Sequence, residues 1–84
     1  MFIGNIYITL KEGVLDPAGK AANNKLRDLG FTNINNIKMG KFIEVELEAE
    51  SKEEAIRQLE AISEQLLANL VIENYRVEVV EGDK

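Results

Sequence analysis

The sequence contains no cysteine and no histidine among its 84 residues. These absences exclude a disulfide framework and leave only oxygen ligands for any metal ion. They also exclude Ser-His, Cys-His and zinc-water mechanisms. Carboxylate pairs remain possible because 15 residues are acidic. A catalytic pair needs burial and proximity, however, whereas these acids mostly alternate along faces that look exposed. We therefore expect no catalytic residue on this chain.

Positive charge and long hydrophobic runs are also scarce. The net charge is −5, which argues against a nucleic-acid partner because such binding depends on clustered Lys and Arg. No apolar run approaches the roughly 20 residues that span a bilayer. The first residues lack the basic region of a signal peptide. We expect a soluble, cytoplasmic protein with no membrane partner.

A chain of 84 residues predicts one domain, residues 1–84. A domain of this size buries only about 60–65% of its unfolded surface, so its stability alone is marginal. Small domains usually add disulfides, a metal or a partner, and oligomerisation is the support that remains here.

The first half predicts a strand and then a helix. Residues 2–10 alternate with a period of two, which is typical of a half-buried strand. Asp16 is a good N-cap residue and Pro17 a good first helical residue. The helix stripe that follows and the Gly that ends it are Ala18, Ala22, Leu26, Leu29 and Gly30.

The middle of the chain predicts a hairpin. A weak strand over residues 34–39 is interrupted by Asn35-Asn36, and Gly40 marks a tight turn. Beyond it, apolar residues alternate with glutamates from Ile43 to Ala49.

The last third predicts a helix and a strand. Ser51 and Glu54 form a capping-box pattern, and Asn69 is expected to close the helix in the left-handed conformation. The apolar stripe between them is Ala55, Leu59, Ile62 and Leu66, and the last strand alternates at Tyr75, Val77 and Val79.

The predicted fold is α+β with the order β-α-β-β-α-β. It is a two-layer sandwich of a four-stranded, mainly antiparallel sheet with two helices on one face. The other face carries Ile3, Tyr7, Phe42 and Val80. Several apolar residues on one open face indicate a contact surface. We expect a homodimer through that face or a sheet edge.

The linker before the first helix is unusually apolar. Leu15 has no hydrophobic staple partner, because the fourth helical residue is Lys20. Gly19 in the first turn costs roughly 1 kcal/mol of helix propensity relative to Ala. Either Val14 and Leu15 tuck under the sheet edge, or the loop presents them to another chain and Gly19 allows close backbone approach.

Three segments carry a resemblance to a known family. They are YITLKEGVLDP from Tyr7 to Pro17, MGKFIE from Met39 to Glu44, and LLANLVIENY from Leu66 to Tyr75. In this order they resemble the PurS subunits of phosphoribosylformylglycinamidine synthase, and the likeness spans nearly the whole chain. The resemblance implies a single PurS-like domain over residues 1–84.

What the resemblance implies about function is an accessory subunit of an ATP-dependent amidotransferase, EC 6.3.5.3. A large synthetase subunit would bind ATP, magnesium and formylglycinamide ribonucleotide, and a glutaminase subunit would release ammonia from glutamine. The small subunit, itself a homodimer or dimer of dimers, would join them and support ammonia transfer. The product is formylglycinamidine ribonucleotide in de novo purine biosynthesis. No cofactor or metal is expected on this chain.

The candidate partner-contact residues are Tyr7, Val14, Leu15, Asp16, Pro17, Gly19 and Phe42. The main alternative function is a small-molecule-sensing regulatory domain, because this element order also serves ligand-binding domains. Its site would be the start of the first helix, where free N–H groups could hold an anion. The carboxylate of Asp16 argues against that site. A nucleic-acid binder would need basic residues around Tyr7 and Phe42, but glutamates surround Phe42.

Overall fold

In the described part of the chain the sheet has three strands, all antiparallel, in the order β2-β1-β3. The computed structural model describes residues 1–82. The predicted first strand is β1 (Phe2–Leu10), which lies in the middle and pairs with β2 (Gly40–Leu47) and β3 (Glu73–Glu81). In this register Tyr7 lies opposite Phe42 on one side and Arg76 on the other. Both outer strands are free edges among the described residues.

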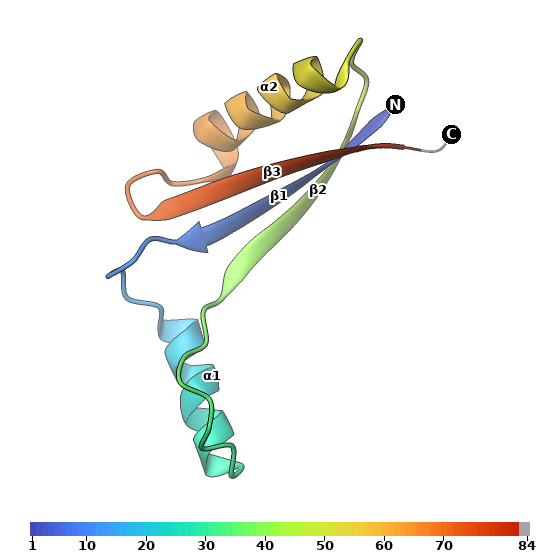
Figure 1. Cartoon of the computed structure of the whole chain (residues 1–84). Helices are drawn as coiled ribbons and strands as arrows, with labels where there is room; N and C mark the ends of the chain where they lie inside the picture. Colours follow the sequence, from blue (N-terminus) through green and yellow to red (C-terminus); the bar gives the residue numbers. More distant parts are fainter. Residues whose placement is uncertain (83–84) are drawn as a thin grey trace.

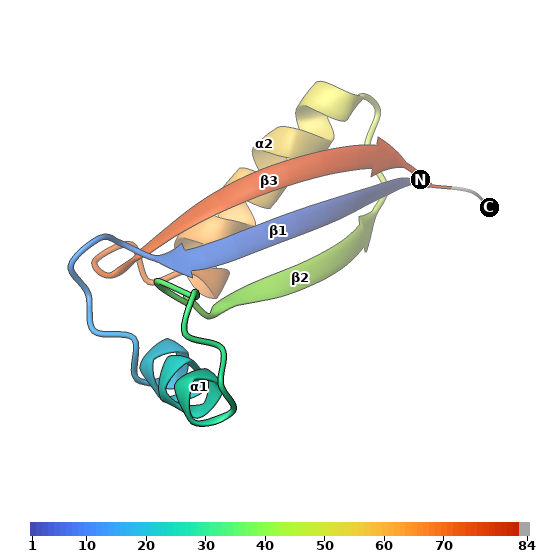
Figure 2. The same ribbon diagram turned by 60° about the horizontal axis from the view of Figure 1, so that its bottom comes forward.

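One helix covers one face of the sheet. This is α2 (Lys52–Ile62), which lies behind the three strands in Figure 2. The Ser51 hydroxyl accepts a hydrogen bond from the Glu54 N–H at 3.1 Å, as the capping pattern predicts. The Glu54 carboxylate instead accepts from the side chain of Gln58. The fully buried core between helix and sheet is Ile6, Ile8, Ala55, Leu59 and Val79.

Gly4 explains how α2 comes so close to β1. A Cβ at this position would overlap the side chain of Leu59, which is fully buried. A glycine inside a strand often marks such a close approach. Because Gly4 has no side chain, Leu59 of α2 can pack directly against β1.

The other helix, α1 (Pro17–Asp28), does not lie on the sheet. It projects away from it with residues 29–39 running back alongside, as Figures 1 and 2 show. The prediction of two helices on one face is therefore wrong. The apolar stripe of α1 is narrow, Gly19 is its only buried residue, and Leu29 is 62% exposed. We call α1 and residues 29–37 the arm, and the sheet with α2 the body.

The predicted fourth strand is also absent from the described residues. Residues 34–39 form no strand; Ile34 and Ile37 are half-buried while the residues between them are exposed. A spacing of three suits packing along a helix better than pairing in a sheet. Gly40 is not a turn residue either, because it begins β2 opposite Thr9. The element order is β-α-β-α-β.

The end of α2 departs from the predicted stripe. A π-helical turn, Ser63–Leu67, follows the helix, and the Ala68 N–H donates to the Ser63 carbonyl at 2.8 Å. The wider turn changes which residue faces inward. Leu67 packs against the core, whereas Leu66 is 80% exposed. Asn69 does not take the left-handed conformation, since Gly13 and Gly30 alone have positive φ among the described residues.

The molecule is extended for its size. Its radius of gyration is 16.4 Å, whereas about 12 Å is expected for a compact chain of this length. The exposed area is 6145 Å², against about 5,000 Å² for a compact monomer of this mass. Within residues 1–82 we find no helix with the length and apolar character needed to cross a membrane.

Candidate interaction surfaces

Two chain segments join the arm to the body, and we call them the elbow: residues 11–16 and residues 38–39. Asp16 connects the two. One carboxylate oxygen, Oδ1, accepts from the Gly19 N–H at 2.9 Å, which is the predicted N-cap contact. The other, Oδ2, accepts from the Met39 N–H at 2.9 Å. The N-cap of α1 is therefore also bound to the residue before β2.

Gly19 is required by a contact within the chain. A Cβ at Gly19 would overlap the carbonyl oxygen of Ile37 and the carboxylate of Asp16. Gly19 thus allows close backbone approach, as predicted. The backbone that approaches it, however, is that of Ile37 in the same chain. This accounts for a residue that otherwise weakens the first turn of α1.

The two apolar linker residues differ in exposure. Val14 is half-buried, whereas Leu15 is 72% exposed. Both line a cavity of about 370 Å³ in the elbow, together with Leu10, Lys11, Lys20 and Ile37. Leu15 does not tuck under the sheet edge and stays available for contact with another chain. Pro17 is exposed at the first position of α1, as predicted.

Most charged side chains of the elbow already have a partner within the chain. Lys38 Nζ lies 2.7 Å from a carboxylate oxygen of Glu12 and lowers the pKa of that carboxyl. The N–H groups of Met39 and then Gly19 hold the pKa of Asp16 below its usual value. The anion site of the sensing alternative is not available, because the Gly19 and Lys20 N–H groups already donate to Asp16.

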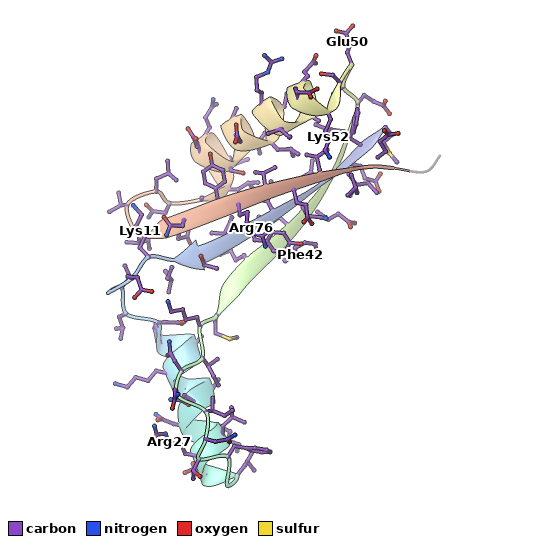
Figure 3. The ribbon with its side chains drawn as sticks, viewed as in Figure 1. Lys11, Arg27, Phe42, Glu50, Lys52 and Arg76 are labelled. Atoms are coloured by element: carbon purple, nitrogen blue, oxygen red, sulfur yellow. The ribbon has the colours of Figure 1, made fainter. Side chains whose placement is uncertain are left out.

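The second surface is the sheet face that α2 leaves uncovered. The rings of Tyr7 and Phe42 have centroids 5.2 Å apart, and the Arg76 guanidinium lies 4.2 Å from the Tyr7 ring centroid. Aromatic rings and the Arg guanidinium combine apolar area with polar groups, and such residues are enriched at protein interfaces. Phe42 is 58% exposed. Figure 3 labels Phe42 and Arg76 on the body, well away from Arg27 on the arm.

Sequence reasoning missed a third surface, the connection from α2 to β3. Its exposed apolar residues are Leu66, Leu70, Val71 and Ile72. The signal for it is the run from Leu66 to Ile72, in which five of seven residues are large and apolar. One face of a helix cannot bury so many neighbouring side chains. Helical spacing from Ala55 onward instead predicts a buried Leu66, and this prediction is wrong.

The predicted contact residues fall into two groups. The elbow brings Val14, Leu15, Asp16, Pro17 and Gly19 together, and the sheet brings Tyr7 beside Phe42. Within residues 1–82, no three acidic side chains gather where they could hold a metal ion. The geometry of both groups suits protein contacts.

Comparison with known proteins gives a single family. The model of the PurS family, described as phosphoribosylformylglycinamidine (FGAM) synthase, matches residues 4–81. The PurS subunit of FGAM synthase from Synechocystis is 47% identical over 88% of this chain and 74% of its own length. The corresponding Archaeoglobus fulgidus subunit is 44% identical over 89% of this chain and 94% of its own.

Solved structures agree in fold as well. Methanocaldococcus jannaschii PurS has a TM-score of 0.90 at 34% identity and covers 99% of this chain and 100% of its own. A chain in the structure of PurLQS from Thermotoga maritima has a TM-score of 0.84 at 30% identity. That match covers 95% of this chain and 99% of the other. The projecting arm is therefore part of a shared fold.

Proposed function

Because this chain belongs to the PurS family of FGAM synthase, we propose that it holds the larger subunits of that enzyme together. As a family member it is a subunit of a purine-biosynthetic enzyme, EC 6.3.5.3. The observation that most supports the assembly role is its fold match to a chain of the Thermotoga maritima PurLQS structure. The chain's own inventory agrees, since it has no His or Cys for catalysis.

The partners in this proposal are a large synthetase subunit and a glutaminase subunit. ATP and magnesium bind the large subunit, and the glutaminase releases ammonia from glutamine. The small subunit keeps the two in register, so that ammonia reaches formylglycinamide ribonucleotide before it escapes into solvent. We place the whole assembly in the cytoplasm, with no nucleic acid and no membrane as partner.

A second copy of this chain is the remaining partner, in a homodimer or a dimer of dimers. The chain exposes 6145 Å², about 1,100 Å² more than a compact monomer of its mass. An ordinary protein interface buries about 800 Å² on each side. The excess is thus of the size that one interface would cover, which supports association with a second copy. In this proposal residues 1–84 are a single PurS-like domain within the oligomer.

Among the contact candidates, Leu15 and Phe42 are the two we expect to touch partners directly. Both are large, apolar and mostly exposed. Val14 and Pro17 extend the elbow surface around Leu15, and Tyr7 extends the patch around Phe42. Asp16 and Gly19 contribute by shaping the elbow.

Reconstitution tests the proposal. The large subunit and the glutaminase are assayed with glutamine, ATP and the ribonucleotide, with and without this chain. We expect glutamine-dependent turnover to require it. Ammonium salt in place of glutamine is the control, because free ammonia bypasses transfer between subunits. Equal glutamine-dependent turnover in both mixtures would contradict the assignment.

A further inference from the structure

The direction of the arm is not set by a buried apolar interface. Figure 1 shows α1 projecting from the end of the sheet, far from α2. Leu29 and Phe31 on the arm are 62% and 53% exposed. Packing against the body therefore contributes little, and the two short segments of the elbow must fix the angle.

Asp16 is the residue in which both elbow segments meet. Gly19, which donates to Oδ1, belongs to α1, and Met39, which donates to Oδ2, immediately precedes β2. β2 in turn is paired with β1 from its first residue, Gly40. One carboxylate thus links the first turn of the arm to a strand of the body.

The fit around this carboxylate is close. A Cβ on Gly19 would overlap both the Ile37 carbonyl and the Asp16 side chain, so only a hydrogen fits there. The backbone at Ile37 therefore lies directly against the first turn of α1. The Glu12–Lys38 pair spans the same two segments, but both side chains are at least half exposed, and such pairs contribute little.

We propose that Asp16 is a latch that fixes the direction of the arm relative to the body. Its Oδ1 caps α1, and its Oδ2 holds the residue before β2, so the two functions belong to different atoms. With the latch closed, the apolar side chains of the arm and the open sheet face are presented to partners in one geometry. This last consequence rests on the proposed function; the latch itself does not.

Asp16→Asn separates the two functions. A carboxamide has one oxygen acceptor, which can still cap α1 through the Gly19 N–H, but its NH₂ group cannot accept from Met39. Asp28→Asn is the matched control. It removes the same charge from an exposed residue at the other end of the helix.

The absence of native cysteine makes a distance measurement simple. Spin labels are attached to Arg27→Cys on the arm and Lys52→Cys at the start of α2, two positions labelled in Figure 3. The doubly labelled chain is diluted into unlabelled chain, so that only distances within one molecule are recorded. The distance distribution and the circular dichroism are then measured for each variant.

We expect Asp16→Asn to broaden the distance distribution while helix content stays unchanged, and Asp28→Asn to change neither. An unchanged distribution in Asp16→Asn overturns the latch. If α1 melts in Asp16→Asn, Gly19→Ala decides, because its Cβ would overlap both the Ile37 carbonyl and the Asp16 Oδ2 that accepts from Met39, while alanine itself favours the helix. A shifted mean distance then supports the latch, and an unshifted one overturns it.

Binding to the large subunit is measured separately on the same variants. We expect Asp16→Asn to weaken it about tenfold, within the usual range of coupling between sites, and Asp28→Asn to leave it unchanged. The distance measurement needs no partner, so it judges the latch even if the reconstitution assay fails. If a variant with a broadened distance distribution still binds normally, the direction of the arm does not affect binding to the large subunit.

Discussion

Tyr75 on β3 donates a hydrogen bond to the carboxylate of Glu64 in the π-helical turn. This bond, with desolvation and the negative charges of Glu64 and Glu60, raises the pKa of Tyr75 to about 12. The bond needs the protonated phenol. Its stabilisation is therefore complete below about pH 10, the ordinary value, and is lost as the pH rises through about 12.

The chain offers a direct test, because Tyr7 is the only other tyrosine. In a Tyr7→Phe background, tyrosinate absorbance reports Tyr75 alone, and its midpoint is expected near pH 12. Adding Glu64→Gln removes the charge, so the midpoint should fall toward about 10. The same midpoint in both proteins would show that Glu64 does not hold the phenol.

At the scale of elements, the π-helical turn decides which leucine belongs to the core. A continuous helix would bury Leu66, but the structure places Leu67 against the core and leaves Leu66 80% exposed. We expect Leu67→Ala to lower the free energy of unfolding by about 1–2 kcal/mol, less than a fully buried leucine because it is only half-buried. Leu66→Ala should stay within about 0.5 kcal/mol.

Denaturant unfolding of the two variants at equal protein concentration checks this, because an oligomer's stability includes its interface. Each variant is the other's control, since both remove the same atoms from neighbouring positions. A larger loss for Leu66→Ala would mean that the α-helix continues regularly past Ser63.

Local signals predicted most of the elements correctly. β1 and the alternation from Ile43 to Leu47 have a clean period of two, and the N-caps Asp16 and Ser51 begin the two helices as expected. These features depend on neighbours in sequence. The segment over residues 34–39 has no clear period, and its place beside α1 is set by contacts of Asp16 with Met39 and of Gly19 with Ile37.

In the candidate site, too, contacts between sequence neighbours could be predicted and contacts between distant residues could not. The cap formed by Asp16 is readable because its partner is three residues away, whereas the contact with Met39 spans 23 residues and leaves no local pattern. Gly19 looks like a defect in the helix until the Ile37 carbonyl is seen beside it. The π-helical turn has no residue signature here that would separate Leu66 from Leu67.

For the whole molecule, the extended shape predicts association. A radius of gyration of 16.4 Å with so few buried residues leaves the isolated chain marginal. Light scattering at micromolar concentration should give at least twice the 9.4 kDa of one chain. A mass of 9.4 kDa throughout that range would contradict this expectation.

The open sheet face is tested by a charge. Phe42→Glu adds a carboxylate where the ring now lies against Tyr7, and burying an unpaired charge in an interface is costly. We expect the mass to fall toward the monomer. Ala61→Glu adds the same charge to an exposed position of α2 and should leave the mass unchanged. If Phe42→Glu also keeps its mass, the dimer contact lies elsewhere, at a strand edge or the arm.

Leu15 gives the sharpest separation of assembly from folding. Its side chain is 72% exposed in the isolated chain, so Leu15→Ser should barely move the unfolding midpoint. Burying a leucine at a contact is worth roughly 1.5–3 kcal/mol, so the affinity for the large subunit should fall about tenfold to a hundredfold.

Val14→Ser is the comparison: Val14 is half-buried in the elbow, so this change should lower the unfolding midpoint as well. Denaturant unfolding and titration against the large subunit are made at matched concentration. A lowered midpoint with normal affinity for Leu15→Ser would show that the leucine serves its own fold.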